Sequence, residues 1–402
     1  MQTNFIDLYQ HLPEGQEAES ILRNCVHCGF CTATCPTYQL LGDELDGPRG
    51  RIYLMKQVFE GKTATQKTLS HLDRCLTCRS CETTCPSGVQ YGRLVDIGRN
   101  IVEQQVERSI GDKIIRKALR IVIPNQTLFS TLLQLGRIFK PILPSKFKTK
   151  IPNTQVAKPW PEKIRQRKML VLGGCVQPTV SPNTNAALAN VLDKLGIQLL
   201  RASNAGCCGA VSHHLSAHEE GLEFMRRNID AWWPYVEQGV EAIVLTASGC
   251  GVVVKDYGKL LAQDSTYAKK AKRISELSKD ISEILSTEDL SKLPRHGVKQ
   301  KVAFHSPCTL QHGQNIVNSV ETILVNAGFE LTNVVDPHLC CGSAGTYSIL
   351  QSELSKQLLD NKLHSLQAES PDVIATANIG CQMHMATKAT VSVKHWIELL
   401  DN

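Results

Sequence analysis

Apolar residues recur at helical spacing in the first quarter of the chain. They lie three or four positions apart over residues 52–59 and again over 94–106, which predicts two helices. The first helix is expected to open at 46–48 (Asp-Gly-Pro) and to close at Gly61, because these residue types favour an N-cap, a first turn and a helix end. This part of the chain is therefore predicted to be mainly helical.

The pattern changes after residue 168, where short apolar runs typical of buried strands alternate with helical patterns. Strands are expected at 169–174 and 241–249, with a helix at 183–195 between them. The same order then recurs as a strand at 302–308, a helix at 319–329 and a strand at 372–380. Two tandem α/β units are the simplest interpretation, and residues 255–301 would supply the last helix of the first unit and a connector.

Residues 111–167 separate the helical part from the α/β part. Pro124, Pro141 and Pro144 interrupt its apolar clusters and break any long helix. Lys and Arg recur from 137 to 168 with Glu162 as the one acid, which favours a solvated linker over a basic strip facing acidic partners or anionic lipid. The predicted division of the chain is 1–110, 111–167, 168–290 and 298–402.

Composition narrows the class of protein. With 402 residues, of which 42% are apolar and 20% charged, the chain can bury several cores, so a disordered protein is excluded. A net charge of +6 is too small and too dispersed to predict a nucleic-acid partner. The start of the chain has no export signal and no run reaches the 18 or so apolar residues of a spanning helix, so a soluble or peripheral cytoplasmic protein is expected.

The chain has 16 cysteines, and half of them form a duplicated iron–sulfur motif. The spacing C-x2-C-x2-C-x3-C-P occurs twice, 50 residues apart, at Cys25, Cys28, Cys31, Cys35 and at Cys75, Cys78, Cys81, Cys85. Three such thiolates can hold three corners of one [4Fe–4S] cluster, and in two-cluster proteins the cysteine before proline ligates the other cluster. Two zinc knots are the alternative, but they use pairs of cysteines rather than triplets.

The motif therefore predicts two [4Fe–4S] clusters with exchanged fourth ligands. Cluster 1 would be held by Cys25, Cys28, Cys31 and Cys85, and cluster 2 by Cys75, Cys78, Cys81 and Cys35. The long interval between Cys35 and Cys75 favours a helical ferredoxin over the compact β-rich kind. Two clusters in one small domain predict a one-electron relay.

The other eight cysteines repeat once in the α/β units. Cys175, Cys207, Cys208 and Cys250 in the first unit correspond to Cys308, Cys340, Cys341 and Cys381 in the second, at offsets of 133 or 131 residues. Each lies at a predicted strand end or helix start, where the loops of α/β units bind ligands. A further metal or redox site in each repeat is predicted, and the alternatives are buried small residues or reducible thiol pairs.

Other candidate residues carry weaker signals. Arg49 and Arg51 could raise the potential of a nearby cluster, although a salt-bridged helix start is favoured. His27, His71, His213, His214 and His305 lie near cysteines and could tune clusters or carry protons, although each alone is more often structural. The sequence contains no Walker loop, GxGxxG strand turn or nucleophile elbow, so no flavin or nucleotide site is expected on this chain.

These motifs resemble a known family. The strings NCVHCGFCTATCPTYQLLGDELDGPRGRIYLMKQV, HLDRCLTCRSCETTCPSGV, GCCGAV, NIDAWWP, TASGCG, HLCCGSAGTY and TANIGCQ are similar to the iron–sulfur subunit of bacterial glycolate oxidase over nearly the whole chain. The resemblance implies a multidomain protein, an α-helical ferredoxin-like domain followed by two tandem α/β cysteine-rich (CCG) repeats. It also implies an electron-transfer subunit of a glycolate dehydrogenase.

The resemblance further implies partner subunits and an electron acceptor, and it leaves alternatives for the reaction. Flavin subunits carrying FAD would oxidise glycolate to glyoxylate, and this chain would pass electrons toward a quinone or another acceptor, with a peripheral contact at the cytoplasmic face of the membrane. The chain would not be catalytic alone. Lactate or glycerol-3-phosphate oxidation and heterodisulfide-type thiol chemistry are alternatives. The related heterodisulfide reductase module has a fifth thiol that both repeats lack here, after Cys250 and after Cys381.

Overall fold

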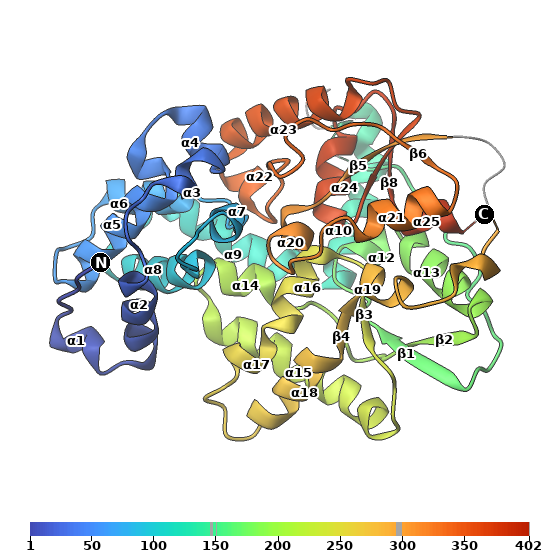
Figure 1. Ribbon diagram of the computed structural model, residues 1–402, viewed down its shortest axis with the longest axis horizontal. Helices are drawn as coiled ribbons and strands as arrows, with labels where there is room; N and C mark the ends of the chain where they lie inside the picture. The colour runs from blue at the N-terminus through green and yellow to red at the C-terminus, as the bar shows by residue number, and fades with distance from the viewer. Residues whose placement is uncertain (145–147, 150, 295–299, 402) are drawn as a thin grey trace.

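The computed structural model describes residues 1–144, 148–149, 151–294 and 300–401. A helical N-terminal part lies beside two α/β repeats, which occupy the green-to-yellow and orange-to-red parts of Figure 1. Each repeat has its own parallel four-stranded sheet. The chain is thus helical first and then α/β twice, as the sequence predicts.

Short helices follow each cysteine triplet in the N-terminal part. Helices α3 and α7 follow the first and second triplets, and the longest helices, α5 and α8, pack together beneath them. The helices are α1 (Asp7–Gln10), α2 (Pro13–Arg23), α3 (Phe30–Ala33), α4 (Pro36–Leu41), the 3-10 turn η1 (Glu44–Asp46), α5 (Pro48–Phe59), α6 (Gln66–Asp73), α7 (Ser80–Thr83) and α8 (Tyr91–Gln105). The two predicted helices correspond to α5 and α8.

One detail of the predicted helix start is wrong. Gly47, not Asp46, occupies the N-cap position of α5, and no side chain caps this helix. The Asp46 carboxylate is buried and accepts hydrogen bonds from His71 and Arg74 instead. Ion pairing with residues distant in sequence therefore replaces the local capping bond.

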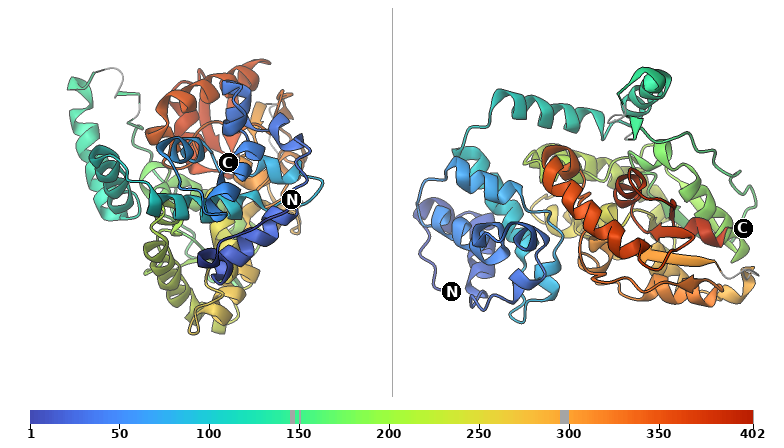
Figure 2. Two further views of the ribbon diagram at one scale, coloured as in Figure 1. Left: turned by 90° about the vertical axis from the view of Figure 1, so that its left-hand side faces the viewer. Right: turned by 90° about the horizontal axis from the view of Figure 1, so that it is seen from above.

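An arm of two helices connects the N-terminal part to the repeats. It consists of α9 (Ile110–Val122), α10 (Gln126–Phe139) and the turn η2 (Lys140–Ile142), and it runs along one side of the molecule in Figure 2. Pro124 lies between α9 and α10, as the expected break requires. Several large apolar side chains of the arm are exposed, including Ile110 and Ile142.

In the first repeat the strands are β1 (Arg167–Val171), β2 (Ile197–Arg201), β3 (Ile243–Leu245) and β4 (Ser278–Asp280), in the sheet order β2-β1-β3-β4. All pairs are parallel. The helices are α12 (Gln177–Val180), α13 (Asn183–Lys194), α14 (Ala210–His214), α15 (His218–Glu237), α16 (Ser248–Lys255), α17 (Tyr257–Leu260), α18 (Ala268–Leu277), α19 (Ile281–Leu285) and the turn η3 (Leu290–Lys292).

The second repeat has the same topology. Its strands are β5 (Lys301–His305), β6 (Glu330–Leu331), β7 (Val373–Thr376) and β8 (Ser392–His395), ordered β6-β5-β7-β8 and all parallel. Its helices are α20 (Cys308–Gln311), α21 (Ser319–Asn326), α22 (Tyr347–Leu350), α23 (Ser352–Gln367), α24 (Ile379–Ala386) and α25 (Ile397–Leu400). The predicted duplication is confirmed.

Some elements differ from the sequence-based expectation. The strands expected at 241–249 and 372–380 end early, and their last residues begin α16 and α24. The segment 255–301, expected to hold a helix and a connector, also contains the strand β4. This strand has three residues, Ser-Lys-Asp, without the apolar run by which a buried strand is recognised.

The two repeats share one apolar core, which includes Val171 of β1 and Phe304 of β5. Their loops also bond directly: the Ser248 N–H donates to the Ala377 carbonyl at 3.0 Å, and His395 Nε2 lies 2.8 Å from the Thr246 carbonyl oxygen. The cysteine-bearing loops of the two sheets are therefore fixed relative to each other.

Candidate metal centres

The first triplet surrounds a cavity together with one cysteine of the second motif. Cys25, Cys28, Cys31 and Cys85 all line this cavity, and Cys81 borders it as well. Burial and the neighbouring thiolates raise the pKa of Cys31 to about 11, which reflects how closely these sulfurs gather. The four residues assigned to cluster 1 are thus brought together.

Both triplets bend through the same strained backbone. His27 and Gly29 in the first loop, and Thr77 and Arg79 at the matching positions of the second, have φ between 53° and 86°. Such left-handed conformations cost energy for residues other than glycine and persist mainly at functional sites. The repeated strain wraps each loop so that its three thiols face one point.

The second triplet gathers with Cys35. Burial raises the pKa of Cys81, and the thiolates of Cys78, Cys75 and Cys35 raise it further, so these sulfurs are mutual neighbours. The Cys75 sulfur also accepts hydrogen bonds from the Thr77 N–H at 3.3 Å and the Tyr91 hydroxyl at 3.6 Å. The four residues assigned to cluster 2 therefore form a second group.

Two arginines lie beside this second group. Burial raises the pKa of Cys75, but the positive charges of Arg51 and Arg99 outweigh it and leave the pKa below the ordinary value. Arg51 is itself buried, is 3.5 Å from Asp46 and donates to the Thr37 hydroxyl. Both expected roles of Arg51 therefore meet in one residue, a salt-bridged helix start and a positive charge beside cluster ligands.

Arg49 is placed differently. It pairs with Glu44 at 2.6 Å on the surface and lines the cavity of the first group. Arg99 and Tyr91 were not predicted from the sequence, because only tertiary packing of α8 brings them to Cys75. The spacing of the apolar residues from Leu94 to Val106 predicted this helix and gave no signal for Arg99 or Tyr91.

The first repeat collects its four cysteines at the C-terminal edge of its sheet. Cys175 follows β1, Cys207 and Cys208 precede α14, and Cys250 lies in α16 after β3. Hydrogen bonds link the thiols in the order Cys175, Cys207, Cys208, Cys250. After β1 the chain crosses to β2 on one side of the sheet, and after β3 it crosses to β4 on the other side. The boundary between β1 and β3 is therefore a topological switch point, where α/β sheets bind ligands.

The second repeat builds the corresponding group. Cys308 and Cys340 have their sulfurs 3.8 Å apart, and further thiol contacts join Cys340 to Cys341 and Cys341 to Cys381. The glycine after each cysteine pair is required, because Gly342 has φ +84° and an added Cβ would lie 2.6 Å from the Ser355 carbonyl oxygen. Gly209 has the same constraint in the first repeat.

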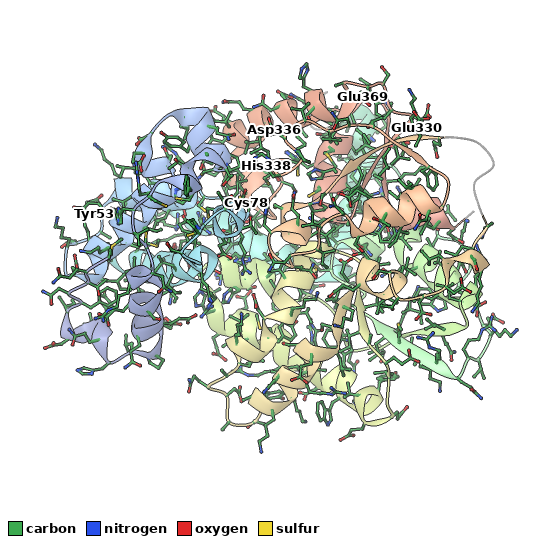
Figure 3. All side chains as sticks on the ribbon, viewed as in Figure 1. Tyr53, Cys78, Glu330, Asp336, His338 and Glu369 are labelled. Atoms are coloured by element: carbon green, nitrogen blue, oxygen red, sulfur yellow. The ribbon has the colours of Figure 1, made fainter. Side chains whose placement is uncertain are left out.

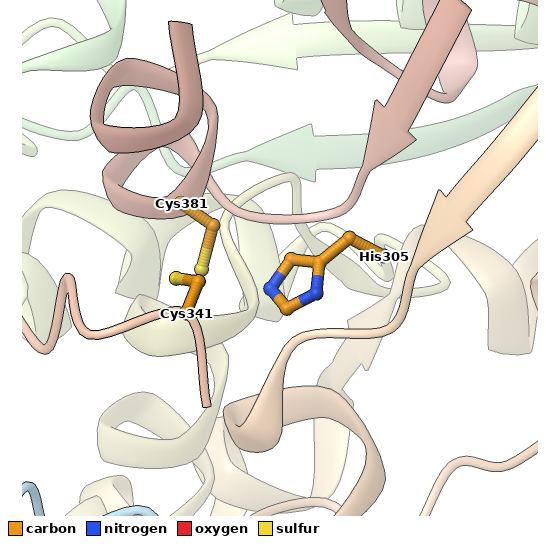
Figure 4. Close-up of side chains that lie close together, drawn as sticks. All are labelled: His305, Cys341 and Cys381. Atoms are coloured by element: carbon orange, nitrogen blue, oxygen red, sulfur yellow. The ribbon is translucent and has the colours of Figure 1, made fainter. Parts of the chain in front are cut away.

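His305 joins the second group. It is the last residue of β5, and its ring points toward Cys341 and Cys381, with the ligand atoms of all three within 4.8 Å of one another (Figure 4). Burial, and next the Lys362 ammonium, lower the pKa of His305 well below its ordinary value. Lys362 was not predicted from the sequence, since it lies in the middle of α23.

The N-terminal helical part touches the second repeat through Cys78. Cys78 packs in one apolar cluster with Cys308 and Cys340, and its thiolate raises the pKa of Cys340. Figure 3 shows Cys78 at the boundary between the helical part and the second repeat. The Tyr347 hydroxyl, which donates to the Arg74 carbonyl at 3.1 Å, also holds this contact.

Two of the other candidate histidines have acidic partners. His71 lies 2.9 Å from Asp46, and His214 lies 3.3 Å from the buried Asp96 of α8. Burial lowers the pKa of His213 to about 3, so its ring is neutral at pH 7. His27 lines the first cavity within its loop. Asp96 is a residue that sequence reasoning missed.

Two family models match the chain. A 4Fe-4S dicluster domain covers residues 21–89, and a cysteine-rich domain matches twice, at 169–255 and 302–386. The glycolate oxidase iron-sulfur subunit of Escherichia coli (strain K12) is 57% identical over 100% of this chain and 98% of its own length. The chain belongs to the glycolate oxidase iron–sulfur subunit family.

Two more distant relatives are similar to more than half of the chain. The probable glycolate oxidase iron-sulfur subunit of Bacillus subtilis (strain 168) is 30% identical over 91% of this chain and 89% of its own length. Lactate utilization protein A of Bacillus licheniformis is 24% identical over 57% of this chain and 96% of its own length. The expected family resemblance is confirmed.

The donor atoms fit the cluster type that this family's domain names. All 16 cysteines are free thiols, and the eight cysteines of the N-terminal part form two groups of four, the number of thiolates that a [4Fe–4S] cluster takes. The two matching loops bring these sulfurs together, and Arg51 and Arg99 lower the pKa of Cys75 among them. The glycolate oxidase iron–sulfur subunit fold therefore presents ready-made cluster sites in its N-terminal part.

Proposed function

We propose that this chain is the electron-transfer subunit of a glycolate dehydrogenase (oxidase) complex, an oxidoreductase whose acceptor is neither NAD nor O2. The observation that carries the proposal is the contact of Cys78 with Cys308 and Cys340, which joins a ferredoxin ligand group to a thiol group of the repeats. A chain built for binding alone would not need adjoining groups of redox ligands. Membership of the glycolate oxidase family supports the substrate.

The ligand assignment follows the two groups described above. Cluster 1 is held by Cys25, Cys28, Cys31 and Cys85, and cluster 2 by Cys75, Cys78, Cys81 and Cys35. The N-terminal part that holds both clusters is a helical ferredoxin-like domain. When bound, these [4Fe–4S] clusters supply one-electron transfer. We also assign an iron–sulfur centre to at least one repeat, through the Cys175 group or the Cys308 group.

The flavin belongs on partner subunits. Removing a hydride from a 2-hydroxy acid transfers two electrons, whereas a cluster held by four thiolates accepts one and leaves the substrate no binding site. FAD on a partner can take both electrons and release them singly. This chain is therefore inactive toward glycolate alone and passes electrons to a quinone or another acceptor.

The helical arm is the surface we assign to docking at the membrane. Its exposed apolar residues Ile110, Ile114 and Ile142 accompany exposed Lys113 and Lys117, a combination typical of helices that lie on anionic lipid. No helix in the described part of the chain has the length and apolarity needed to cross a bilayer. We infer peripheral attachment at the cytoplasmic face; part of the basic strip at 137–168 lies outside the described residues.

Reconstitution tests the function. The full chain, purified anaerobically without flavin, should be reducible by dithionite but show no glycolate-dependent dye reduction. Adding FAD-containing partner subunits should restore electron transfer from glycolate to a quinone analogue. Glycolate oxidation by the flavin-free chain would contradict the proposal.

A lactate-oxidising complex is the second candidate, because lactate utilization protein A aligns with more than half of this chain. Lactate in place of glycolate in the same reconstitution separates the two. A heterodisulfide-type reductase would instead need thiol reduction without any flavin partner.

A further inference from the structure

The two repeats have the same four cysteines but different surroundings. At the offset of 133 residues that relates Cys175 to Cys308, His305 corresponds to Leu172, which is buried in the apolar core. With the same offset, Lys362 corresponds to Ile229, also a core residue. The second repeat therefore places an imidazole and an ammonium where the first has two aliphatic side chains.

His305 is unusual in being buried without a partner. Its exposed fraction is 1%, and neither ring nitrogen has a hydrogen-bond partner among the described residues. Burying such polar atoms unpaired costs free energy, because the hydrogen bonds that they made with water are not replaced, so an isolated structural role is unfavourable. The ring faces the sulfurs of Cys341 and Cys381 (Figure 4).

We propose that His305 is a ligand of an iron–sulfur centre in the second repeat, which is thus held by both thiolate and imidazole. Nitrogen and sulfur atoms bound at about 2.0–2.3 Å to one metal ion lie within about 4.6 Å of each other. The three ligand atoms of His305, Cys341 and Cys381 lie within 4.8 Å, close to that limit. The proposal rests on the iron–sulfur function assigned above.

Iron fits this site better than zinc. With Cys308 and Cys340 the site offers five donor side chains, whereas a structural zinc ion takes four. The site also adjoins Cys78, a ligand of cluster 2, where a metal that changes redox state is useful and zinc is not. The first repeat offers thiols alone, so the two centres differ in kind.

Lys362 supports a charged centre at this position. Its ammonium is 3% exposed and donates to the carbonyls of Asp336 and Pro337, at 2.9 and 3.5 Å. Burial lowers the pKa of Lys362, and thiolates at Cys341 and Cys340 oppose that shift and favour the charged ammonium. A buried cation beside several thiolates offsets the negative charge that metal ligands carry.

The imidazole has a consequence for the redox potential. A neutral histidine in place of a thiolate leaves a centre less negative and raises its potential, as in clusters where histidine replaces cysteine on one iron. The second-repeat centre should therefore accept an electron more readily than an all-thiolate centre would.

The first experiment needs no variant. Full-length protein, grown with [15N]histidine and with natural histidine, is purified anaerobically and titrated with dithionite under electron paramagnetic and electron–nuclear double resonance. We expect iron beyond the eight atoms of two [4Fe–4S] clusters and one paramagnetic centre with strong nitrogen coupling that changes with the isotope. Absence of that coupling, or zinc with no further iron, would overturn the proposal.

Variants of the full chain identify the residue. His305→Leu, which copies the first repeat, should lose the nitrogen coupling and the iron of this centre while the ferredoxin signals persist. His305→Cys should keep the iron, lose the coupling and lower the potential. His395→Leu removes another buried imidazole, one that lies against the Thr246 carbonyl oxygen and outside the group of His305, Cys341 and Cys381, and should keep both the coupling and the iron. Unchanged coupling in both His305 variants would overturn the proposal.

The outcome is separable from the function proposed above. If the nitrogen coupling is absent but the ferredoxin signals and the transfer from flavin subunits remain, His305 is not a ligand and the electron-transfer function stands. If transfer from the flavin subunits fails while the coupling is present, His305 is a ligand and the proposed electron-transfer function is wrong.

Discussion

Individual residues show how far spacing alone determines a site. The two groups of four ferredoxin cysteines follow from C-x2-C-x2-C and the proline after the fourth cysteine, because local loops set the geometry. Arg99, Asp96 and Lys362 could not be predicted, since each reaches its partners across many residues of chain through helix packing. The signal for such residues is their burial, which a single sequence does not display.

Exchange of the fourth ligands gives the first prediction. Because Cys85 lines the cavity of the first triplet, Cys85→Ser should disturb cluster 1 and leave cluster 2 intact. Cys35→Ser is the matched control and should do the opposite. Electron paramagnetic resonance of the reduced proteins distinguishes the clusters, and loss of the second triplet's signal in Cys85→Ser would show that the ligands are not exchanged.

The charge of Arg51 gives the second. Reduction adds a negative charge to a cluster, so a buried cation nearby stabilises the reduced state. Arg51→Gln should therefore lower the reduction potential of cluster 2. We expect a shift of about 60 mV or more, which for one electron is a tenfold change in the equilibrium constant for reduction. Asp46 keeps His71 and Arg74 as partners, so the fold should survive. Arg49→Gln should shift cluster 1 instead. Equal shifts of both clusters in a potentiometric titration would contradict this placement.

At the scale of elements, long periodic helices and apolar strands were predictable, whereas short or polar ones were not. Helices α5, α8 and α13 and strands β1, β5 and β7 carry clear periodicity or apolar runs. Strands β4, β6 and β8 have two to four residues with polar members, and parallel pairing in the sheet makes them strands. Tertiary context outweighs local pattern in such segments.

Contact between α8 and α14 gives an element-scale prediction. Burial raises the pKa of Asp96, but the charge and hydrogen bond of His214, together with smaller contributions that include Arg99, outweigh burial, so the folded value lies below the ordinary one. A lowered carboxyl pKa contributes stability above the unfolded pKa of about 3.9, and that stability is lost as pH falls from there toward the folded value. Asp96→Asn should thus lower the free energy of unfolding at neutral pH by about 1.5–3 kcal/mol.

The pH dependence checks the cause. Denaturant midpoints of the wild type and Asp96→Asn should differ at pH 7 and converge as pH falls below about 4, where the carboxylate begins to protonate in the unfolded chain while it stays ionised in the folded protein. His214→Gln should give a similar loss at neutral pH. A difference between wild type and Asp96→Asn that does not change with pH would show that packing, not charge, is lost.

At the scale of the whole molecule, the arrangement of the parts could not be predicted from the sequence. Duplication predicted two repeats, but which repeat brings its cysteines against the second triplet of the N-terminal part depends on the surfaces of both parts. Cys78 adjoins Cys308 and Cys340 of the second repeat, whereas the thiols of the first repeat interact with one another. Two similar cysteine groups therefore hold different positions in the molecule.

That difference predicts unequal roles for matched cysteines. Cys308→Ser and Cys175→Ser remove equivalent thiols, but of the two only Cys308 interacts with Cys78 of the second triplet. Since electron transfer slows steeply with distance, Cys308→Ser should slow the reoxidation of cluster 2 by a quinone analogue in the complex with flavin subunits, and Cys175→Ser should slow it less. Rapid-freeze resonance after mixing with glycolate measures both rates. Equal rates in the two variants would mean that electrons leave the ferredoxin part by another surface, with the second repeat outside the path.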